Sequence, residues 1–238
     1  MQATQIRSST HCRLWQVDLD APPAPQAVAA LSDAEWERAR RFVFKKDRDR
    51  FVAAHAALRD TLAGQAEIPA ALLEFSEGPF GKPTLVERPG LRFNLSHSRS
   101  MGLIAVCESA EIGVDIELLR PMPDADALAH SYFSDAERLA LGALPPELRE
   151  RAFLTCWTRK EACLKATGMG LSVDTRSFDV GISPEARDVS ITTADSEVRL
   201  ALESFDDIHG ATCAVARVLE CEQIVLPRRL AADKEIYA

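Results

Sequence analysis

The chain has 238 residues, 47% of them hydrophobic and 27% charged, a balance typical of a folded globular protein. Its formal net charge of −8 argues against nucleic-acid binding, because affinity for phosphate backbones depends on clustered lysine and arginine. No uncharged apolar run approaches the roughly 20 residues of a membrane span, and the N-terminal segment lacks a signal-peptide core. We therefore expect a cytoplasmic protein that binds neither nucleic acid nor membrane.

The six cysteines form no C-x-x-C pair and have no histidine cluster beside them. This scatter argues against a zinc site or a disulfide framework. We expect reduced thiols in the core at all six positions: Cys12, Cys107, Cys156, Cys163, Cys213 and Cys221.

The first half of the chain predicts two helices, a turn-rich loop and three strands. Residues 32–35 fit a capping box, which indicates a helix running towards Val43. Apolar residues at helical spacing over 51–62 indicate a second helix, for which Gly64 is a plausible stop. A loop rich in glycine and proline follows at 77–83. Short strands are expected at 91–97, 102–107 and 112–118.

A basic segment between Arg38 and Arg50 contains seven lysines and arginines, opposed only by Asp47 and Asp49, which leaves a local charge of +5. On an acidic chain this pattern suits a solvated helix face, one confined anionic ligand or an acidic partner.

The second half begins at 120–123, where two prolines break the pattern and mark a candidate lobe boundary. One or two helices are expected over 124–144, and a strong helix over 147–167 ends at Gly168. The tail over 178–219 alternates like strands. Because helices and antiparallel-type strands occur in both halves, the pattern predicts an α+β fold. Each half has a long helix followed by strands, although the residues alone do not establish a repeat.

The strand expected at 112–118 carries two acids on one face. Alternation turns Ile112, Val114 and Ile116 towards the core and Asp115 with Glu117 to the opposite face. Carboxylates so close raise each other's pKa unless a cation lies between them. Oxygen ligands without nearby histidine or cysteine suit Mg²⁺ bound beside substrate phosphates. The alternative is a solvent-facing strand with two ordinary acidic residues.

The strong helix places Trp157, Glu161 and Leu164 on one face, and Glu161 lies four residues before Lys165. An exposed pair of this kind is common on helices. Trp157 should hold this face against the core, so Glu161 becomes a candidate third metal ligand or a base.

The strand expected at 91–97 turns Phe93, Leu95 and His97 to one face and Asn94 with Ser96 to the other. The side chains of Ser96 and His97 therefore diverge, which argues against a serine hydrolase. Their position at a strand end suits hydrogen bonds to phosphate oxygens, and a structural histidine is the alternative.

In this order, the segments resemble the 4′-phosphopantetheinyl transferases, specifically the larger surfactin-synthetase-activating type. The match extends over about 38–172, whereas the first 30 or so residues and the tail carry little specific signal. The matching pieces are Phe75 with Gly81–Pro83, Phe93–Ser98, Gly113–Glu117, Trp157–Lys165 and Gly168–Ser172.

The resemblance implies two similar α+β lobes, 1–118 and 119–238, related by a pseudo-twofold axis, with coenzyme A in the cleft between them. It implies an Mg²⁺-dependent enzyme of the holo-[acyl-carrier-protein] synthase type, and because two lobes in one chain need no dimer to build the cleft, we expect a monomer. Such an enzyme transfers 4′-phosphopantetheine from coenzyme A to a serine of an apo acyl or peptidyl carrier protein and releases adenosine 3′,5′-bisphosphate.

The resemblance also implies roles for single residues. Asp115, Glu117 and Glu161 match metal ligands, Glu161 matches the base that deprotonates the serine, and Lys165 matches the lysine beside the reacting phosphate. The chain departs from some members at Phe51, where they have a threonine near the nucleotide. The matched coenzyme A contacts are Lys82, Ser96, His97 and Lys165, with Arg38 at the adenosine 3′-phosphate and Arg50 assigned more loosely.

Two other functions fit the same residues. An Mg²⁺-dependent hydrolase of nucleotide pyrophosphates would use the same carboxylates with water in place of serine. A non-catalytic module that binds carrier proteins is possible in principle, but it would have no use for a metal cluster. The sequence leaves open whether the carrier serves fatty-acid, polyketide or nonribosomal-peptide synthesis.

Overall fold

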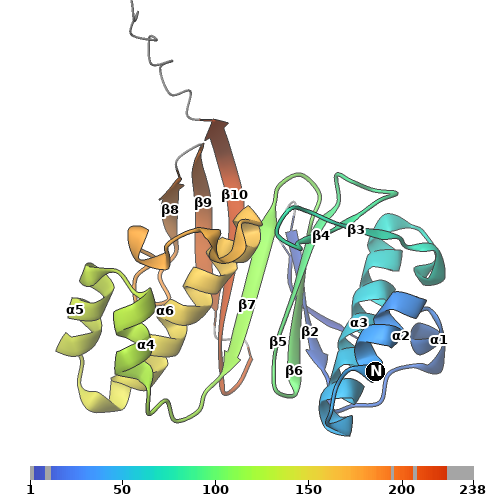
Figure 1. Ribbon diagram of the computed structural model, residues 1–238, viewed down its shortest axis with the longest axis horizontal. Helices are drawn as coiled ribbons and strands as arrows, with labels where there is room; N and C mark the ends of the chain where they lie inside the picture. The colour runs from blue at the N-terminus through green and yellow to red at the C-terminus, as the bar shows by residue number, and fades with distance from the viewer. Residues whose placement is uncertain (1–2, 9–11, 194–195, 206–207, 224–238) are drawn as a thin grey trace, which may run out of the picture.

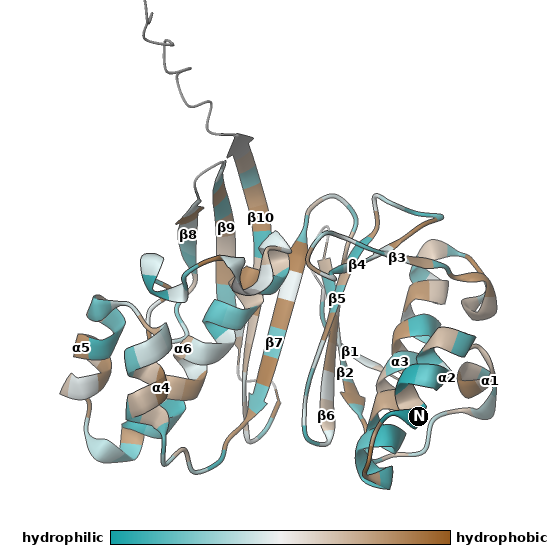
Figure 2. Ribbon diagram, in the orientation of Figure 1, coloured by the Kyte–Doolittle hydropathy of each residue, from teal (hydrophilic) through white to brown (hydrophobic). Residues whose placement is uncertain are grey.

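The structure, a computed structural model, describes residues 3–8, 12–193, 196–205 and 208–223. In Figure 1 two sheets occupy the centre, and each is covered on its outer side by helices. Figure 2 shows hydrophobic residues along the central strands and hydrophilic residues on the outer turns of the helices. No helix in these ranges combines the length and the apolar character that crossing a membrane requires.

The N-terminal lobe contains an antiparallel sheet of four strands and three helices. The strands follow the order β1 (Thr4–Ser8), β2 (Cys12–Asp18), β6 (Met101–Cys107) and β5 (Arg92–Ser98). The helices are α1 (Pro25–Ala29), α2 (Asp33–Arg40) and α3 (Lys45–Ala66), and a hairpin of β3 (Phe75–Glu77) and β4 (Pro83–Leu85) follows the 3-10 turn Ala70–Leu72.

The C-terminal lobe has a second antiparallel sheet. Its strands follow the order β7 (Ile112–Leu118), β10 (Ala211–Gln223), β9 (Ser196–Phe205) and β8 (Arg187–Thr192). Its helices are α4 (Ala125–Tyr132), α5 (Asp135–Ala143) and α6 (Pro146–Thr167), followed by 3-10 turns at Gly170–Ser172 and Thr175–Ser177.

Both lobes repeat one order of elements. A strand (β2 or β7) leads into two short helices and a helix of 22 residues, and a later hairpin (β5–β6 or β9–β10) returns its last strand to pair with the first. The second helix of each lobe begins with a capping box. Its glutamate, Glu35 or Glu137, accepts from Arg59 or Lys160 of the long helix at 2.8 Å in each lobe. The structure therefore contains the repeat and confirms the α+β prediction.

The lobe limits of 1–118 and 119–238 stay a prediction, and 1–2 and 224–238 lie outside the described residues. Strand β7 pairs with β10, so residues 112–118, which the prediction placed in the N-terminal lobe, form backbone hydrogen bonds with the C-terminal sheet. Apolar residues of β2 and β6 pack against β7 and β10 to form a core between the two sheets.

Helix ends differ in two places from the sequence prediction. The helix that starts at the Ser32 capping box ends at Arg40, short of Val43. The next helix runs through Gly64 and stops after Ala66, where Glu67 takes a left-handed conformation with φ of 59°. Gly64 is therefore not the stop, because a side-chain-bearing residue supplies the left-handed turn.

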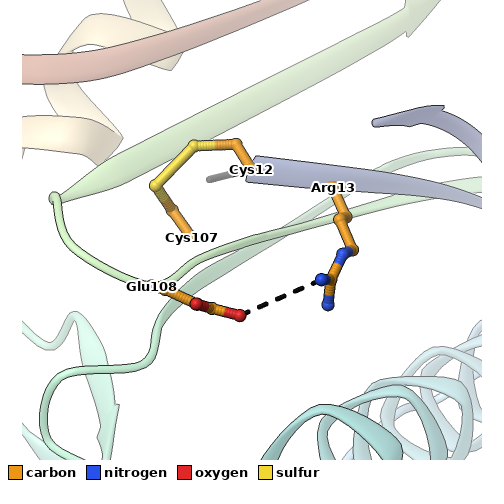
Figure 3. The surroundings of a disulfide bond; sticks show 4 residues. All are labelled: Cys12, Arg13, Cys107 and Glu108. Carbon is orange, nitrogen blue, oxygen red and sulfur yellow. Dashed lines mark ion pairs between the residues drawn. A yellow bond between two sulfur atoms is a disulfide. The ribbon is translucent and has the colours of Figure 1, made fainter. Parts of the chain in front are cut away.

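Two cysteines correct the expectation of reduced thiols. Cys12 and Cys107 lie directly opposite each other in the β2–β6 pair, with Cα atoms 4.2 Å apart, and form a disulfide (Figure 3). Arg13 and Glu108 beside them form an ion pair of 4.0 Å. Since β2 was not predicted, the sequence could not bring these cysteines together. The four cysteines outside this disulfide are Cys156, Cys163 and Cys213, all buried, and the exposed Cys221.

Candidate active site

The edge strands β5 and β7 of the two sheets run side by side (Figure 1). The two strands are linked by hydrogen bonds between side chains of β5 and the backbone of β7, in place of the backbone hydrogen bonds that join strands within a sheet. Asn94 Oδ1 accepts from the backbone N–H of Val114 at 2.9 Å, and Ser98 Oγ accepts from that of Leu118 at 3.2 Å. Because both pairs are 20 residues apart in sequence, the two strands run parallel. We call this junction the seam.

Asp115 is the buried centre of the seam, with 5% of its surface exposed. Its Oδ1 accepts from Ser96 Oγ at 2.8 Å and from Lys165 Nζ at 2.6 Å. Its Oδ2 is buried and has no hydrogen-bond partner among the residues that the structure describes. Burial raises the pKa of Asp115 to about 6 and the charge of Glu161 adds to this, although Lys165 and Ser96 act in the opposite direction. The free oxygen and the raised pKa both indicate that this carboxylate can take a further cation.

Gly113 explains why Asp115 and Lys165 can meet. A Cβ atom at Gly113 would lie 2.2 Å from the carbonyl oxygen of Ala162 and 2.3 Å from the backbone nitrogen of Ala166. Only a glycine therefore allows β7 to touch the backbone of α6 here. This close approach holds the α6 turn that carries Lys165 against the strand that carries Asp115.

A cavity of about 240 Å³ opens beside this contact. Glu161 and Lys165 line it from α6, Asn94 from β5 and residues 80–83 from the turn before β4. Glu161 is half-buried, and its charge acts on Asp115. The structure thus brings four predicted residues to one place: Ser96, Asp115, Glu161 and Lys165.

Glu117 lies two residues further along β7 and is engaged differently. Its Oε2 accepts from Ser98 Oγ at 2.7 Å and from Arg120 Nη1 at 2.7 Å. In the described ranges, no three His, Cys, Asp or Glu side chains are already gathered as metal ligands. The free oxygen of Asp115 and the all-oxygen donors nevertheless fit Mg²⁺, and Asp115, Glu117 and Glu161 stay the predicted ligands.

Lys82, a predicted phosphate contact, lines this cavity and also binds protein oxygens. Its Nζ donates to Glu111 Oε2 at 2.6 Å, the Ala166 carbonyl at 2.9 Å and the Ile112 carbonyl at 3.1 Å. Burial lowers the pKa of Lys82, while the hydrogen bond to Glu111 opposes this. An ammonium group has three donors, and here all three link the 78–83 turn to β7, α6 and the residue before β7, so the phosphate contact of Lys82 stays a prediction.

The other predicted phosphate contacts lie apart. Arg38 lines a second, larger cavity of about 980 Å³, where its guanidinium sits over the Phe51 ring at 5.5 Å. Arg50 instead donates to both carboxylate oxygens of Asp20, at 2.7 and 2.9 Å, and lines neither cavity. His97 is exposed overall. Partial desolvation of its imidazole lowers its pKa, and the positive charge of Lys165 lowers it further.

The larger cavity is lined by a second arginine of the basic segment and by a histidine that the sequence did not single out. Arg41 and His55 line it, with His55 Nδ1 donating to Glu35 Oε1 at 2.9 Å. Burial alone would raise the pKa of Glu35, but hydrogen bonds from His55, the Ser32 backbone and Arg59 lower it to about 2. The capping box identified Glu35 only as a helix start. Strand alternation places Asn94 and Ser98 on the face of Ser96, but their hydrogen bonds to β7 were not predicted.

The two cavities meet at the 78–83 turn, since Gly81 and Pro83 line both. A ligand with a bulky aromatic end and a phosphate chain could therefore reach from Arg38 past this turn to Lys165.

Comparison with known proteins identifies the family. A model of the 4′-phosphopantetheinyl transferase superfamily matches 111–216, and a model of the N-terminal part of 4′-phosphopantetheinyl transferases matches 22–109. The 4′-phosphopantetheinyl transferase HetI of Nostoc sp. is 38% identical over 181 residues, covering 74% of this chain and 76% of HetI. Sfp of Bacillus subtilis is 28% identical over 207 residues, covering 85% of this chain and 91% of Sfp. AcpT of Escherichia coli is 36% identical over 121 residues, covering 51% and 58%. With a match in each lobe and a relative as similar as HetI, this chain belongs to the 4′-phosphopantetheinyl transferase superfamily.

Proposed function

We propose that this protein transfers 4′-phosphopantetheine from coenzyme A to a serine of an apo carrier protein, with the reaction beside Asp115, Glu161 and Lys165. Membership of the superfamily supports the transfer, because HetI and Sfp are both named 4′-phosphopantetheinyl transferases. One observation supports the location: Lys165, which lines a cavity between the lobes, pairs with a buried carboxylate that keeps one oxygen free.

Coenzyme A would lie across both cavities. The larger cavity, of about 980 Å³, has room for the adenosine part, and Arg38 with Arg41 supplies positive charge for its 3′-phosphate. The pyrophosphate would pass Gly81 and Pro83, which line both cavities, and reach Lys165. Lys82 would support this path by fixing the turn, since its ammonium group is bound to protein oxygens.

Asp115 and Glu161 would hold Mg²⁺, and Glu117 could join them after leaving Arg120. When bound, the metal would offset negative charge on the pyrophosphate. The free oxygen of Asp115 supports this assignment, because Ser96 and Lys165 engage only the other oxygen and leave this one open to a metal ion.

The chemical step would use two side chains of α6. Glu161 would take the proton of the carrier's serine hydroxyl as its oxygen forms a bond to the β-phosphorus of coenzyme A. The bond from that phosphorus to adenosine 3′,5′-bisphosphate breaks, and Lys165 would stabilise the negative charge on the departing group. Ser96 would orient Asp115 and thereby Lys165, because it donates to the same carboxylate oxygen.

The finer assignments belong to the same proposal. We propose an acyl or peptidyl carrier protein as acceptor and an activity of the holo-[acyl-carrier-protein] synthase type. Since one chain supplies both lobes and both cavities, we propose a monomer. The use of coenzyme A and carrier proteins favours the cytoplasm.

Mass spectrometry of an apo-carrier tests the proposal. After incubation with the protein, coenzyme A and Mg²⁺, the carrier should gain the mass of one phosphopantetheine on serine. A pyrophosphate hydrolase would consume coenzyme A without any carrier, and a binding module would form a complex without a mass change. Either result would overturn the proposed function.

A further inference from the structure

The turn between β5 and β6 contains a strained arginine. Ser98 pairs with Met101 in the ladder, so Arg99 and Ser100 alone form the turn. Arg99 has a φ of 51°, a left-handed conformation that favours glycine over residues with a Cβ atom. Backbone strain of this kind persists where the surroundings fix it, and it concentrates at functional sites. A charged side chain at this position therefore requires an explanation.

The protein does not use the charge of Arg99 internally. Its side chain is exposed, and its guanidinium has no hydrogen-bond or ion-pair partner among the described residues. The backbone of the turn is nevertheless held, because the Ser100 carbonyl accepts from the N–H of Leu19 at 2.7 Å. The fold thus keeps the turn in place while its cation remains available to another molecule.

The turn lies at one end of the seam. Ser98, directly before Arg99, donates to Glu117, and Glu117 also binds Arg120 at the exit of β7. Figure 1 shows the β5–β6 turn and the end of β7 at the same edge of the molecule. Leu119, between Glu117 and Arg120, is 38% exposed. Two arginines and an apolar side chain therefore border the site where the acids lie.

Small anionic substrates are a poor explanation for Arg99. The basic residues that line the two cavities include Arg38, Arg41 and Lys165, and Arg99 lines neither cavity. A macromolecular acceptor is different, because its surface must cover the edge of the site to bring its serine to Glu161. On a chain with a net charge of −8, an unpaired cation at this edge would attract an acidic acceptor.

We propose that Arg99 is a docking residue for the carrier protein and pairs with an acidic side chain near the modified serine. This inference rests on the proposed function. The pair lies at the edge of the complex, so Arg99 affects encounter with the carrier and its salt dependence rather than the chemical step.

The test compares R99G, R99K and R99E in the full-length protein, with apo acyl carrier protein as the probe. R99G should raise the KM for the carrier about fivefold, and R99E about tenfold or more, as expected from loss or reversal of one edge ion pair. The kcat and the KM for coenzyme A should not change, and R99K should behave like the wild type. R176G is the matched control, because exposed Arg176 pairs with Asp174 and should leave the carrier KM unchanged.

Thermal unfolding separates docking from a structural role. R99G relieves the left-handed strain, so its Tm should rise by a few degrees while its use of the carrier weakens. An unchanged carrier KM in R99E, or a lower Tm in R99G, overturns the docking role alone. Failure of the wild type to modify any apo-carrier would overturn the proposed function, and this inference with it.

Discussion

Replacement of Gly113 by alanine tests how the active site is held together. The added Cβ would lie 2.2 Å from the Ala162 carbonyl oxygen, whereas ordinary contacts begin near 3.4 Å. The atoms in the way belong to the backbone of α6, so no side-chain rotation can relieve the clash. Strand β7 and helix α6 must therefore separate by about 1 Å, a shift that follows from this contact.

The separation should affect stability and catalysis together. Overpacking against rigid structure destabilises by about 2–3 kcal/mol, which corresponds to a loss of about 4–12 °C in Tm for a protein of this size. Because Asp115 is on the strand and Lys165 on the helix, their 2.6 Å contact should lengthen. A misplacement of about 1 Å reduces turnover by about 10²-fold. The KM for coenzyme A should change less, since the larger cavity lies within the N-terminal lobe.

Thermal unfolding and steady-state transfer to an apo-carrier measure both effects. Gly142→Ala is the matched control, because nothing lies within 4 Å of the added atom on α5. It should be neutral or slightly stabilising. If Gly113→Ala matched this control in Tm and turnover, the proposed packing of β7 on α6 would be wrong.

Three further predictions concern the stability of the fold. Glu35→Gln should lower the unfolding free energy at pH 7 by up to about 3 kcal/mol, because the native pKa of about 2 lies below the ordinary 4.5. In urea titrations this difference should hold above about pH 5 and shrink as the pH falls towards 2, and a difference independent of pH would contradict the ion-pair account. In the same assay, Lys82→Met should lower the unfolding free energy by about 2–3 kcal/mol, because it leaves a carboxylate and two carbonyls without their donor. An unchanged unfolding free energy would contradict this structural role of Lys82. Alkylation of the unfolded, unreduced protein should label four of the six cysteines, and reduction of the Cys12–Cys107 bond should lower stability by about 2–4 kcal/mol; labelling of all six would show that the bond does not form.

Much of the fold could be predicted because its local signals are strong. The Ser32 capping box forms as expected, the helix before Gly168 ends there, and the three strands around 91–118 appear within a residue or two of the predicted positions. The first strands, β1 and β2, were not predicted, although Trp15, Val17 and Leu19 alternate with the polar Gln16 and Asp18 in the way that a half-buried strand does. Their pairing with β6 is a long-range contact, so the Cys12–Cys107 disulfide could not be inferred either.

For the candidate site, the sequence predicted which kinds of side chain take part, but few of the hydrogen bonds and ion pairs that they form. Strand alternation correctly gave Asp115 and Glu117 one face, but that face lies in the seam against β5 and not in solvent. Motif order suggested Lys82 as a phosphate contact, whereas its three donors meet protein oxygens from segments distant in sequence. Such contacts depend on how the two lobes pack against each other, and a local sequence pattern does not specify that packing.

The most direct test of the account is single-turnover transfer by Glu161→Gln. With saturating coenzyme A, Mg²⁺ and an apo-carrier, mass spectrometry of quenched samples gives the rate of the chemical step. We predict a rate lower by about 10²- to 10⁴-fold with little change in the affinity for coenzyme A, while Glu147→Gln, at an exposed position of the same helix, keeps the wild-type rate. A wild-type rate in Glu161→Gln would remove this carboxylate from the reaction and contradict the proposed active site.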